Sequence, residues 1–298
     1  ENMDNILLVE DSKTLAYAIE SRINEHEHLQ CHTCFDMASA FQLLKTGHDF
    51  DLAILDLHLP DAENGEIVDI VKRYDIPVIV QTGSMSPKIR TTIEKKSIVD
   101  YVIKEDMSSI EYTISLVHRI LSNRTKRAII VDPSPGYRSK IAKLLNRQLI
   151  KTYEASDGEE ALGILKTIQN ISLILTATDM EKMNGIKLIK HIRKTFNKDE
   201  LSIIVFADSH KKHESATLLK RGANDTIDTL FNEEEFTTRV NNNLEMMDLL
   251  SDNRDKANKD YLTGICNRRH FFELGEKIYD NASRGNIQIA IAMLDIDH

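Results

Sequence analysis

Acidic, hydroxyl and basic residues stand at the ends of short apolar runs in the first part of this 298-residue chain. Glu10 and Asp11 follow one such run, and Asp56 follows another. Each close pair of carboxylates costs roughly 4 kcal/mol at 4 Å and an effective dielectric near 20. A divalent cation relieves that repulsion, and ligands that are all oxygen favour Mg²⁺. The pattern therefore predicts a magnesium site, provided that the three residues meet in the fold.

Two further groups suit a phosphoryl ligand. Thr82 ends the fourth apolar run and Lys104 ends the fifth. A hydroxyl and an ammonium group at these points can hold the oxygens of a phosphoryl group carried by Asp56. Phosphoryl transfer requires mainly in-line positioning and charge neutralisation from a protein. Scattered surface acids would explain any one of these residues, but they explain the whole ordered set poorly.

The elements between these residues alternate regularly. Apolar runs of four or five residues without polar alternation indicate strands that are buried on both faces. Helix-period segments separate them, for example Leu15, Ile19 and Ile23. Five such units predict a doubly wound parallel α/β sheet, with its chemistry at the carboxyl ends of the strands.

The pattern occurs twice, at an offset of about 120 residues. The matched runs are Ile6–Glu10 with Ala128–Asp132, Leu52–Leu55 with Leu173–Leu175, and Pro77–Val80 with Ser202–Val205. A long helical segment over residues 233–258 then follows, which we interpret as a connector, a helix confined to the second domain being the alternative. We expect domains at 1–124 and 125–245, a helical linker at 246–258, and a further fragment at 259–298.

Over residues 4–124 the chain resembles the response regulator receiver family, which implies a flavodoxin-like fold and a sensor histidine kinase or phosphotransfer protein as partner. The resemblance implies that Asp56 accepts the phosphoryl group. It also implies that Tyr101 is the aromatic switch residue, whose rotamer changes when Thr82 moves. Thr82 and Lys104 would contact the phosphoryl group. The implied Mg²⁺ ligands are Glu10, Asp11, Asp56 and the backbone carbonyl of His58.

Three features depart from the usual pattern of that family. Gly65 lies nine residues after Asp56 rather than eight, so the intervening loop carries one extra residue. Glu105 replaces the usual proline after Lys104, and a cis bond before a non-proline residue would cost roughly 2.5–4 kcal/mol. His58 is an uncommon side chain at its position and can alter the lifetime of the acyl phosphate.

The second copy lacks the reactive groups. Ala177 stands at the acceptor position and Asp132 is the one retained acid. An alternative register would make Asp179 the acceptor. We interpret the copy as a pseudo-receiver that keeps the fold without the chemistry. The other replacements are Pro133 for the second metal acid, Ala207 for the hydroxyl residue, Thr226 for the aromatic residue and Thr229 for the lysine.

A third motif begins at Asp260. The string D-Y-L-T-G-I-C-N-R-R, with L-D-I-D-H at the end of the chain, resembles the opening of GGDEF domains, the diguanylate cyclases. The apolar residues over 287–294 predict a strand. The resemblance implies an incomplete α/β fragment and a catalytic metal on Asp295 and the Ile296 carbonyl. It also implies GTP as substrate and a homodimer. The signature loop is absent from this sequence, so the fragment alone does not make cyclic di-GMP.

Composition limits the classes of partner and the location that we expect for this chain. The net charge of −9 argues against nucleic acid, and no apolar stretch reaches the roughly 18 residues needed to span a bilayer. Without an export signal, the expected location is the cytoplasm. Cys31 and Cys34 form a C-x-x-C, but we expect them to be buried cysteines on opposite faces of a strand.

The leading hypothesis is a response regulator whose phosphorylation at Asp56 controls a C-terminal diguanylate cyclase. The alternative is a phosphorylation-dependent scaffold or cyclic di-GMP receptor with a degenerate output domain. A phosphate sink without output is less consistent with the motif at Asp260.

Overall fold

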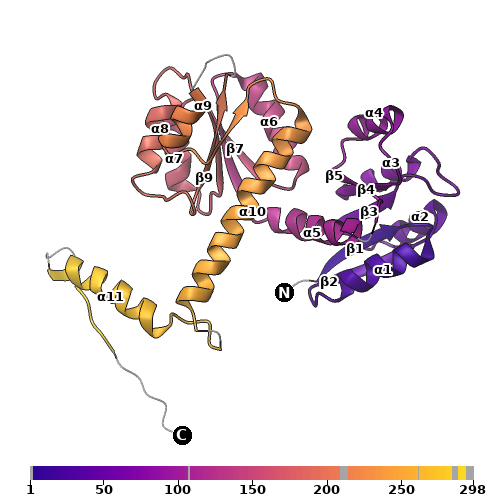
Figure 1. Ribbon diagram of the computed structural model, residues 1–298, viewed down its shortest axis with the longest axis horizontal. Coiled ribbons are helices and arrows are strands. Elements are labelled where there is room, and N and C mark those ends of the chain that lie inside the picture. Colours follow the sequence, from indigo (N-terminus) through magenta and orange to yellow (C-terminus); the bar gives the residue numbers. More distant parts are fainter. Residues whose placement is uncertain (1–2, 107, 209–213, 261, 284–287, 293–298) are drawn as a thin grey trace, which may run out of the picture. The chain divides into compact units, whose positions relative to one another are not determined.

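The computed structural model describes residues 3–292, with gaps at 107, 209–213, 261 and 284–287. It contains two parallel five-stranded sheets, each flanked by helices on both faces (Figure 1). The first domain comprises β1 (Asp4–Val9), α1 (Lys13–Asn24), β2 (Leu29–Cys34), α2 (Met37–Lys45), β3 (Leu52–Asp56), α3 (Glu66–Lys72), β4 (Val78–Thr82), α4 (Pro87–Lys96), β5 (Asp100–Ile103) and α5 (Ser108–Asn123).

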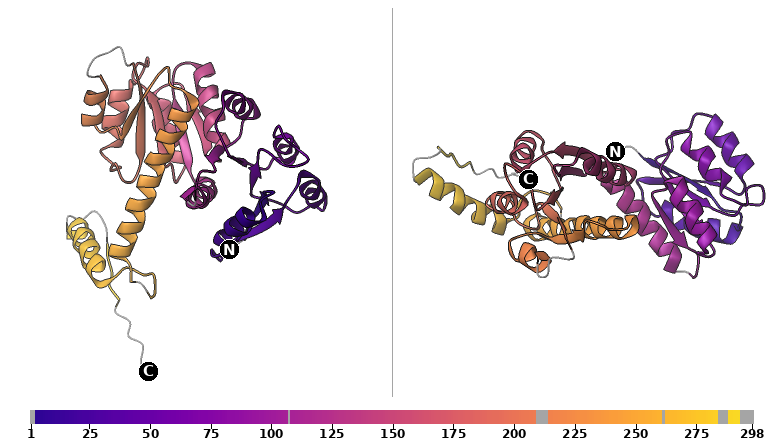
Figure 2. Two further views of the ribbon diagram at one scale, coloured as in Figure 1. Left: turned by 45° about the vertical axis from the view of Figure 1, so that its right-hand side comes forward. Right: turned by 90° about the horizontal axis from the view of Figure 1, so that it is seen from above.

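The strand order of the first sheet is β2-β1-β3-β4-β5, and all pairs are parallel. Helices α2, α3 and α4 cover one face, where Leu7 and Leu55 are fully buried. Helices α1 and α5 cover the other face, where Ile6 and Ile54 are fully buried. The two views of Figure 2 show the same layers. Because each strand alternates its side chains between the faces, both faces require apolar residues, and the predicted doubly wound fold is confirmed.

Polar residues stand where the helices of this domain begin. The side chains of Ser12, Asp36 and Ser86 accept hydrogen bonds from backbone amides in the first turns of α1, α2 and α4. Such caps satisfy amide groups that have no partner within a helix. Gly65 precedes α3 with a φ of 71°. The loop from Asp56 to Gly65 thus ends in a left-handed conformation that glycine adopts without strain.

The second domain repeats this architecture with the strand order β10-β9-β8-β6-β7. Its sheet is parallel throughout, and the repeat predicted from sequence is confirmed. Its elements are β6 (Arg127–Val131), α6 (Pro135–Arg147), β7 (Lys151–Ala155), α7 (Gly158–Thr167), β8 (Leu173–Ala177), α8 (Gly185–Ile192), β9 (Ser202–Ala207), α9 (Glu214–Lys220) and β10 (Asp225–Asp228).

Helix α10 spans Glu233–Asn258, as predicted from sequence. Phe236, Val240 and Leu244 are almost fully buried, whereas Leu249 and Leu250 farther along the helix are exposed. The chain divides into two compact units, Glu1–Asn241 and Asn242–His298. The apolar residues of α10 are therefore divided between a packed amino-terminal part and an exposed carboxy-terminal part.

The carboxy-terminal unit contains α11 (Arg268–Ser283) after a turn in which Lys259 and Cys266 form an isolated bridge. The predicted strand over 287–294 is wrong for residues 288–292, which have no regular structure. A strand requires a neighbouring strand to pair with its backbone groups, and none lies beside this segment in the described part of the unit. No described helix is both long and apolar enough to cross a membrane.

Cys31 and Cys34 lie in β2 and are each 7% exposed. Their side chains belong to the two opposite cores of the first sheet, Cys34 on the α2–α4 side and Cys31 on the α1–α5 side. Both are free thiols, and burial raises the pKa of Cys31 to about 12. The prediction of buried strand cysteines is confirmed.

Candidate functional site

Asp56 is the last residue of β3, at the carboxyl edge of the first sheet. Its side chain is nearly enclosed, with 3% of the residue exposed. One carboxylate oxygen, Oδ1, accepts a hydrogen bond from the backbone amide of His58 at 3.0 Å. The opposite residue in the register is Gln81, immediately before Thr82. Asp56 is thus fixed at the switch point of a doubly wound sheet, the edge at which such folds bind ligands.

Glu10 and Asp11 come directly after β1 and face Asp56. One carboxylate oxygen from each of the three residues lies within 4.8 Å of the other two. Glu10 is fully buried and Asp11 is exposed. Burial and the charge of Asp56 raise the pKa of Glu10 above its ordinary value, in opposition to Lys104. A cluster of three carboxylates with one open side has the oxygen donors that fit Mg²⁺.

Lys104 joins two members of this cluster. Its Nζ donates to Asp56 Oδ2 at 2.7 Å and to Glu10 Oε2 at 3.0 Å. Burial alone would lower the pKa of Lys104, but the two carboxylates outweigh it and raise that pKa. The ammonium group therefore stays charged beside the acceptor. The structure describes no cis peptide bond, so the peptide between Lys104 and Glu105 is trans.

Thr82 ends β4, fully buried and paired in register with Ile103 of β5. Its Oγ1 donates to the backbone carbonyl of Ser84 at 2.9 Å. In this arrangement the hydroxyl is engaged with its own loop. A hydroxyl that leaves the Ser84 carbonyl would become available to a phosphoryl oxygen.

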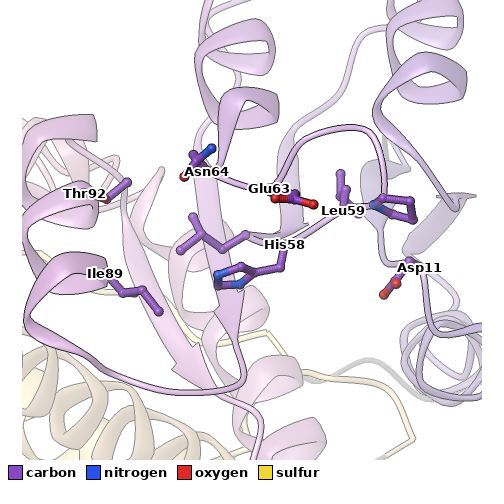
Figure 3. A pocket seen from close by; sticks show the side chains of 9 residues that line it. Asp11, His58, Leu59, Glu63, Asn64, Ile89 and Thr92 are labelled. Atoms are coloured by element: carbon purple, nitrogen blue, oxygen red, sulfur yellow. The ribbon is translucent and has the colours of Figure 1, made fainter.

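A pocket of about 530 Å³ opens beside the acceptor. Asp11, His58 and Ile89 are among the residues that line it. Figure 3 shows the His58 ring extending toward Ile89, with Asp11 on the opposite side of the pocket. Asp11, the exposed member of the carboxylate cluster, lies in the wall of this pocket, so the pocket adjoins the side of the cluster that faces solvent.

Tyr101, in β5, makes a contact that the sequence did not reveal. Its hydroxyl donates to Glu234 Oε1 at 2.8 Å, and Arg90 of α4 donates to Glu234 Oε2 at 3.2 Å. Burial and the Glu234 carboxylate raise the pKa of Tyr101 to about 12. Glu234 belongs to the first turn of α10. The predicted switch residue is therefore bonded directly to that helix.

A second contact between the domains is buried. Gln148 Nε2 donates to the backbone carbonyl of Val99 at 2.6 Å. Gln148 Oε1 accepts from Asn241 Nδ2 at 3.2 Å. Gln148 and Asn241 are 3% and 1% exposed. Because a buried amide that loses its partner is costly, this chain of bonds holds α10 to the residues immediately before β5.

The second domain places its replacement residues at equivalent points of its sheet. Ala177 ends β8 and pairs with Phe206, just as Asp56 ends β3 and pairs with Gln81. Ala207 ends β9 opposite Asp228, the residue before Thr229. Asp132 and Pro133 follow β6. A methyl group occupies the acceptor position, and Asp179 lies beyond the strand end.

Aromatic residues occupy this edge of the second domain. Tyr137 packs edge-on against Phe206 with ring centroids 5.1 Å apart, and Phe231 stacks on Phe236 at 4.9 Å. The Tyr137 hydroxyl donates to the Thr229 carbonyl at 3.4 Å. Their apolar packing replaces the charged cluster of the first domain and joins β9 to α10.

The carboxy-terminal candidates are only partly described. Asp260 accepts bonds from the amides of Leu262 and Thr263 and from the Thr263 hydroxyl, so it organises a turn. Asp295 and Ile296 lie outside the described residues.

The family model of the response regulator receiver domain matches residues 6–114 and again residues 128–241. A chemotaxis protein CheY homolog of Campylobacter jejuni is 30% identical over 102 residues, which are 34% of this chain and 78% of that protein. The chemotaxis protein CheY1 of Helicobacter pylori is 31% identical over 102 residues, which are 34% of this chain and 82% of that protein.

Two solved structures are similar over both domains. One, a two-component system response regulator/GGDEF domain protein, is 33% identical with a TM-score of 0.75. The other, described in nearly the same words, is 33% identical with a TM-score of 0.74. Each match covers 82% of this chain and 99% of the solved one.

Proposed function

Because this chain belongs to the response regulator receiver family, we propose that Asp56 accepts a phosphoryl group from a sensor histidine kinase or phosphotransfer protein. The observation that carries the proposal is the buried carboxylate of Asp56, held by Lys104 beside Glu10 and Asp11. A carboxylate oxygen attacks phosphorus and the bond from phosphorus to the donor nitrogen breaks. The imidazole of the donor leaves with the electron pair.

The residues around Asp56 fit this transfer. Lys104 neutralises charge on the acceptor and on the incoming oxygens. Mg²⁺ bound by Glu10, Asp11, Asp56 and the His58 carbonyl would neutralise the remaining charge. The exposed side of the cluster at Asp11 leaves a path for the donor.

We further propose that phosphorylation reaches α10 through Tyr101. Thr82 leaves the Ser84 carbonyl for a phosphoryl oxygen, which vacates space beside β5 and lets Tyr101 turn away from Glu234. The present contacts, Tyr101 and Arg90 on Glu234, then describe the unphosphorylated arrangement. In this proposal the second domain has no phosphorylation of its own and acts as the support of α10.

The proposed output is a diguanylate cyclase that uses GTP. Two observations support it: the motif that begins at Asp260, and the two similar solved structures named as response regulator/GGDEF domain proteins. A homodimer is part of the proposal. Met246, Leu249 and Leu250 follow a helical i, i+3, i+4 spacing and are all exposed, which suits a helix partner from a second copy.

The test uses the full-length protein that contains the complete cyclase domain. We expect a small-molecule phosphodonor to change cyclic di-GMP synthesis and oligomeric state in the wild type but not in Asp56→Asn. Asp179→Asn, the matched control, should respond like the wild type. Equal responses in Asp56→Asn and wild type would refute control by Asp56. A phosphorylated protein with no synthesis would instead favour the scaffold or receptor function.

A further inference from the structure

Three histidines meet at the amino-terminal edge of the first sheet. His26 lies in the turn after α1, His28 immediately precedes β2, and His118 lies in α5. Their ring centroids are 4.3 Å apart for His26 and His118, 5.7 Å for His28 and His118, and 6.0 Å for His26 and His28. Asp56 lies at the other end of the strands, so this cluster is separate from the phosphorylation site.

The backbone that carries two of these rings is fixed. The His26 amide donates to the Ile23 carbonyl at 3.1 Å, and the His26 carbonyl accepts from Leu29 at 2.9 Å. The His28 carbonyl accepts from the amide of Asp4, at the start of β1, at 2.9 Å. Their Cα positions are thus held against the sheet edge. Only side-chain torsions remain to be ordered when a ligand binds, which lowers the entropy cost of binding.

His118 contains a buried polar atom without a partner. Its Nε2 is inaccessible to solvent and makes no hydrogen bond to any described group. Burial and the neighbouring His26 and His28 hold the pKa of His118 below its ordinary value. The neutral imidazole is the form of histidine that binds metal ions. Because buried polar atoms are nearly always satisfied, this nitrogen requires an explanation such as a bound ion.

We propose that His26, His28 and His118 form a site for one divalent transition-metal ion such as Zn²⁺ or Ni²⁺, with one imidazole nitrogen from each. Imidazole ligands suit these ions rather than Mg²⁺ or Ca²⁺. Zinc–nitrogen bonds of about 2.0–2.1 Å in tetrahedral geometry place ring centres about 5 Å apart, and the observed separations lie on both sides of that value. A water molecule would complete the four ligands.

Binding requires the rings to turn toward one point. Among the described residues, Glu10, Asp11 and Asp56 are the one group of three potential ligands whose ligand atoms already lie within 4.8 Å of one another. The ring nitrogens of the three histidines must therefore come closer together before they can share an ion. His28 is exposed and His26 is half-buried, so both rings have room to rotate. The bound ion then joins the α1–β2 turn to α5, the helix that leads into the second domain.

The test is calorimetric titration of the tag-free chain with ZnCl₂, in excess Mg²⁺ that saturates the carboxylate cluster. We expect one zinc ion per chain. His118→Gln and the exposed His28→Gln should each weaken binding by about tenfold or more, because each removes a ligand. His48→Gln is the matched control, since His48 pairs with His32 outside the cluster; its affinity should equal that of the wild type.

Substitution of Co²⁺ for zinc gives a second readout, because nitrogen ligands in tetrahedral geometry produce visible absorption that His28→Gln should lose. Zinc binding of equal strength in wild type and in both cluster variants, with circular dichroism confirming their folds, would overturn the proposal. Asp56→Asn should retain the zinc site, and His28→Gln should retain phosphorylation. A result that refutes the zinc site therefore leaves the phosphorylation of Asp56 untouched, and the reverse also holds.

Discussion

Replacement of Lys104 by methionine removes the ammonium group that bonds both Asp56 and Glu10. At an effective dielectric near 20, each contact contributes roughly 6 kcal/mol of gross attraction at distances near 3 Å, and desolvation of the three groups offsets most of it. Loss of one partner of a buried ion pair costs about 3–5 kcal/mol. Because the cluster is open to solvent at Asp11, we expect the lower end, about 3 kcal/mol.

Urea unfolding followed by circular dichroism measures this loss in the first domain. Mg²⁺ should recover most of it in Lys104→Met, because the ion replaces the missing positive charge, and it should stabilise the wild type less. Lys96→Met is the matched control. Lys96 pairs with Asp69, whose side chain is 58% exposed, so we expect a loss under about 1 kcal/mol that does not respond to Mg²⁺.

The reasoning would be refuted if Lys104→Met were as stable as wild type without divalent ions. It would be refuted equally if the loss were the same with and without Mg²⁺, because the loss would then come from the packing of the Lys104 stem and not from carboxylate repulsion.

Three further predictions follow from single contacts. A double-mutant cycle of Tyr101→Phe and Glu234→Gln, measured by urea unfolding, should give a coupling of about 1 kcal/mol; no coupling would mean that the hydrogen bond does not form in solution. Because the pKa of Glu10 is raised in the folded protein, the native state binds more protons than the unfolded chain. The stability that Glu10 contributes is therefore complete below its ordinary pKa of 4.5, and it is lost as the pH rises through the raised pKa. Glu10→Gln should therefore flatten the decline of the unfolding free energy over that range, and an unchanged slope would contradict the assignment. In urea unfolding, Gly65→Ala should destabilise by about 1–2 kcal/mol, because φ is 71° and the added Cβ would lie 2.6 Å from Leu57 Cδ1. Gly163→Ala, in α7 with open space around it, should leave stability unchanged or raise it in the same assay.

The sequence predicted the parallel sheets because strands buried on both faces are continuous apolar runs, and the acids that end them mark the carboxyl edge. Asp56, Lys104 and Glu10 could be identified because each lies at a strand end. Helix α10 could be predicted because Phe236, Val240 and Leu244 recur at intervals of four residues, as on one face of a helix.

Other features depend on contacts between distant residues. Tyr101 and Glu234 are 133 positions apart, and their bond depends on how α10 lies against β5. The aromatic packing around Tyr137 is equally invisible in the sequence, because its members come from four separate segments. The expected strand at 287–294 had the right composition, but composition does not supply the neighbouring strand that it needs.

The central claim is that this chain accepts one phosphoryl group, on Asp56 and nowhere else. Intact-protein mass spectrometry after incubation with a small-molecule phosphodonor and Mg²⁺ measures it directly, with peptide mapping to locate the modification. We predict a gain of one phosphoryl group in wild type, mapped to Asp56, and none in Asp56→Asn. A second phosphoryl group mapped to Asp179 or Asp132, or a modification that persists in Asp56→Asn, would contradict the account.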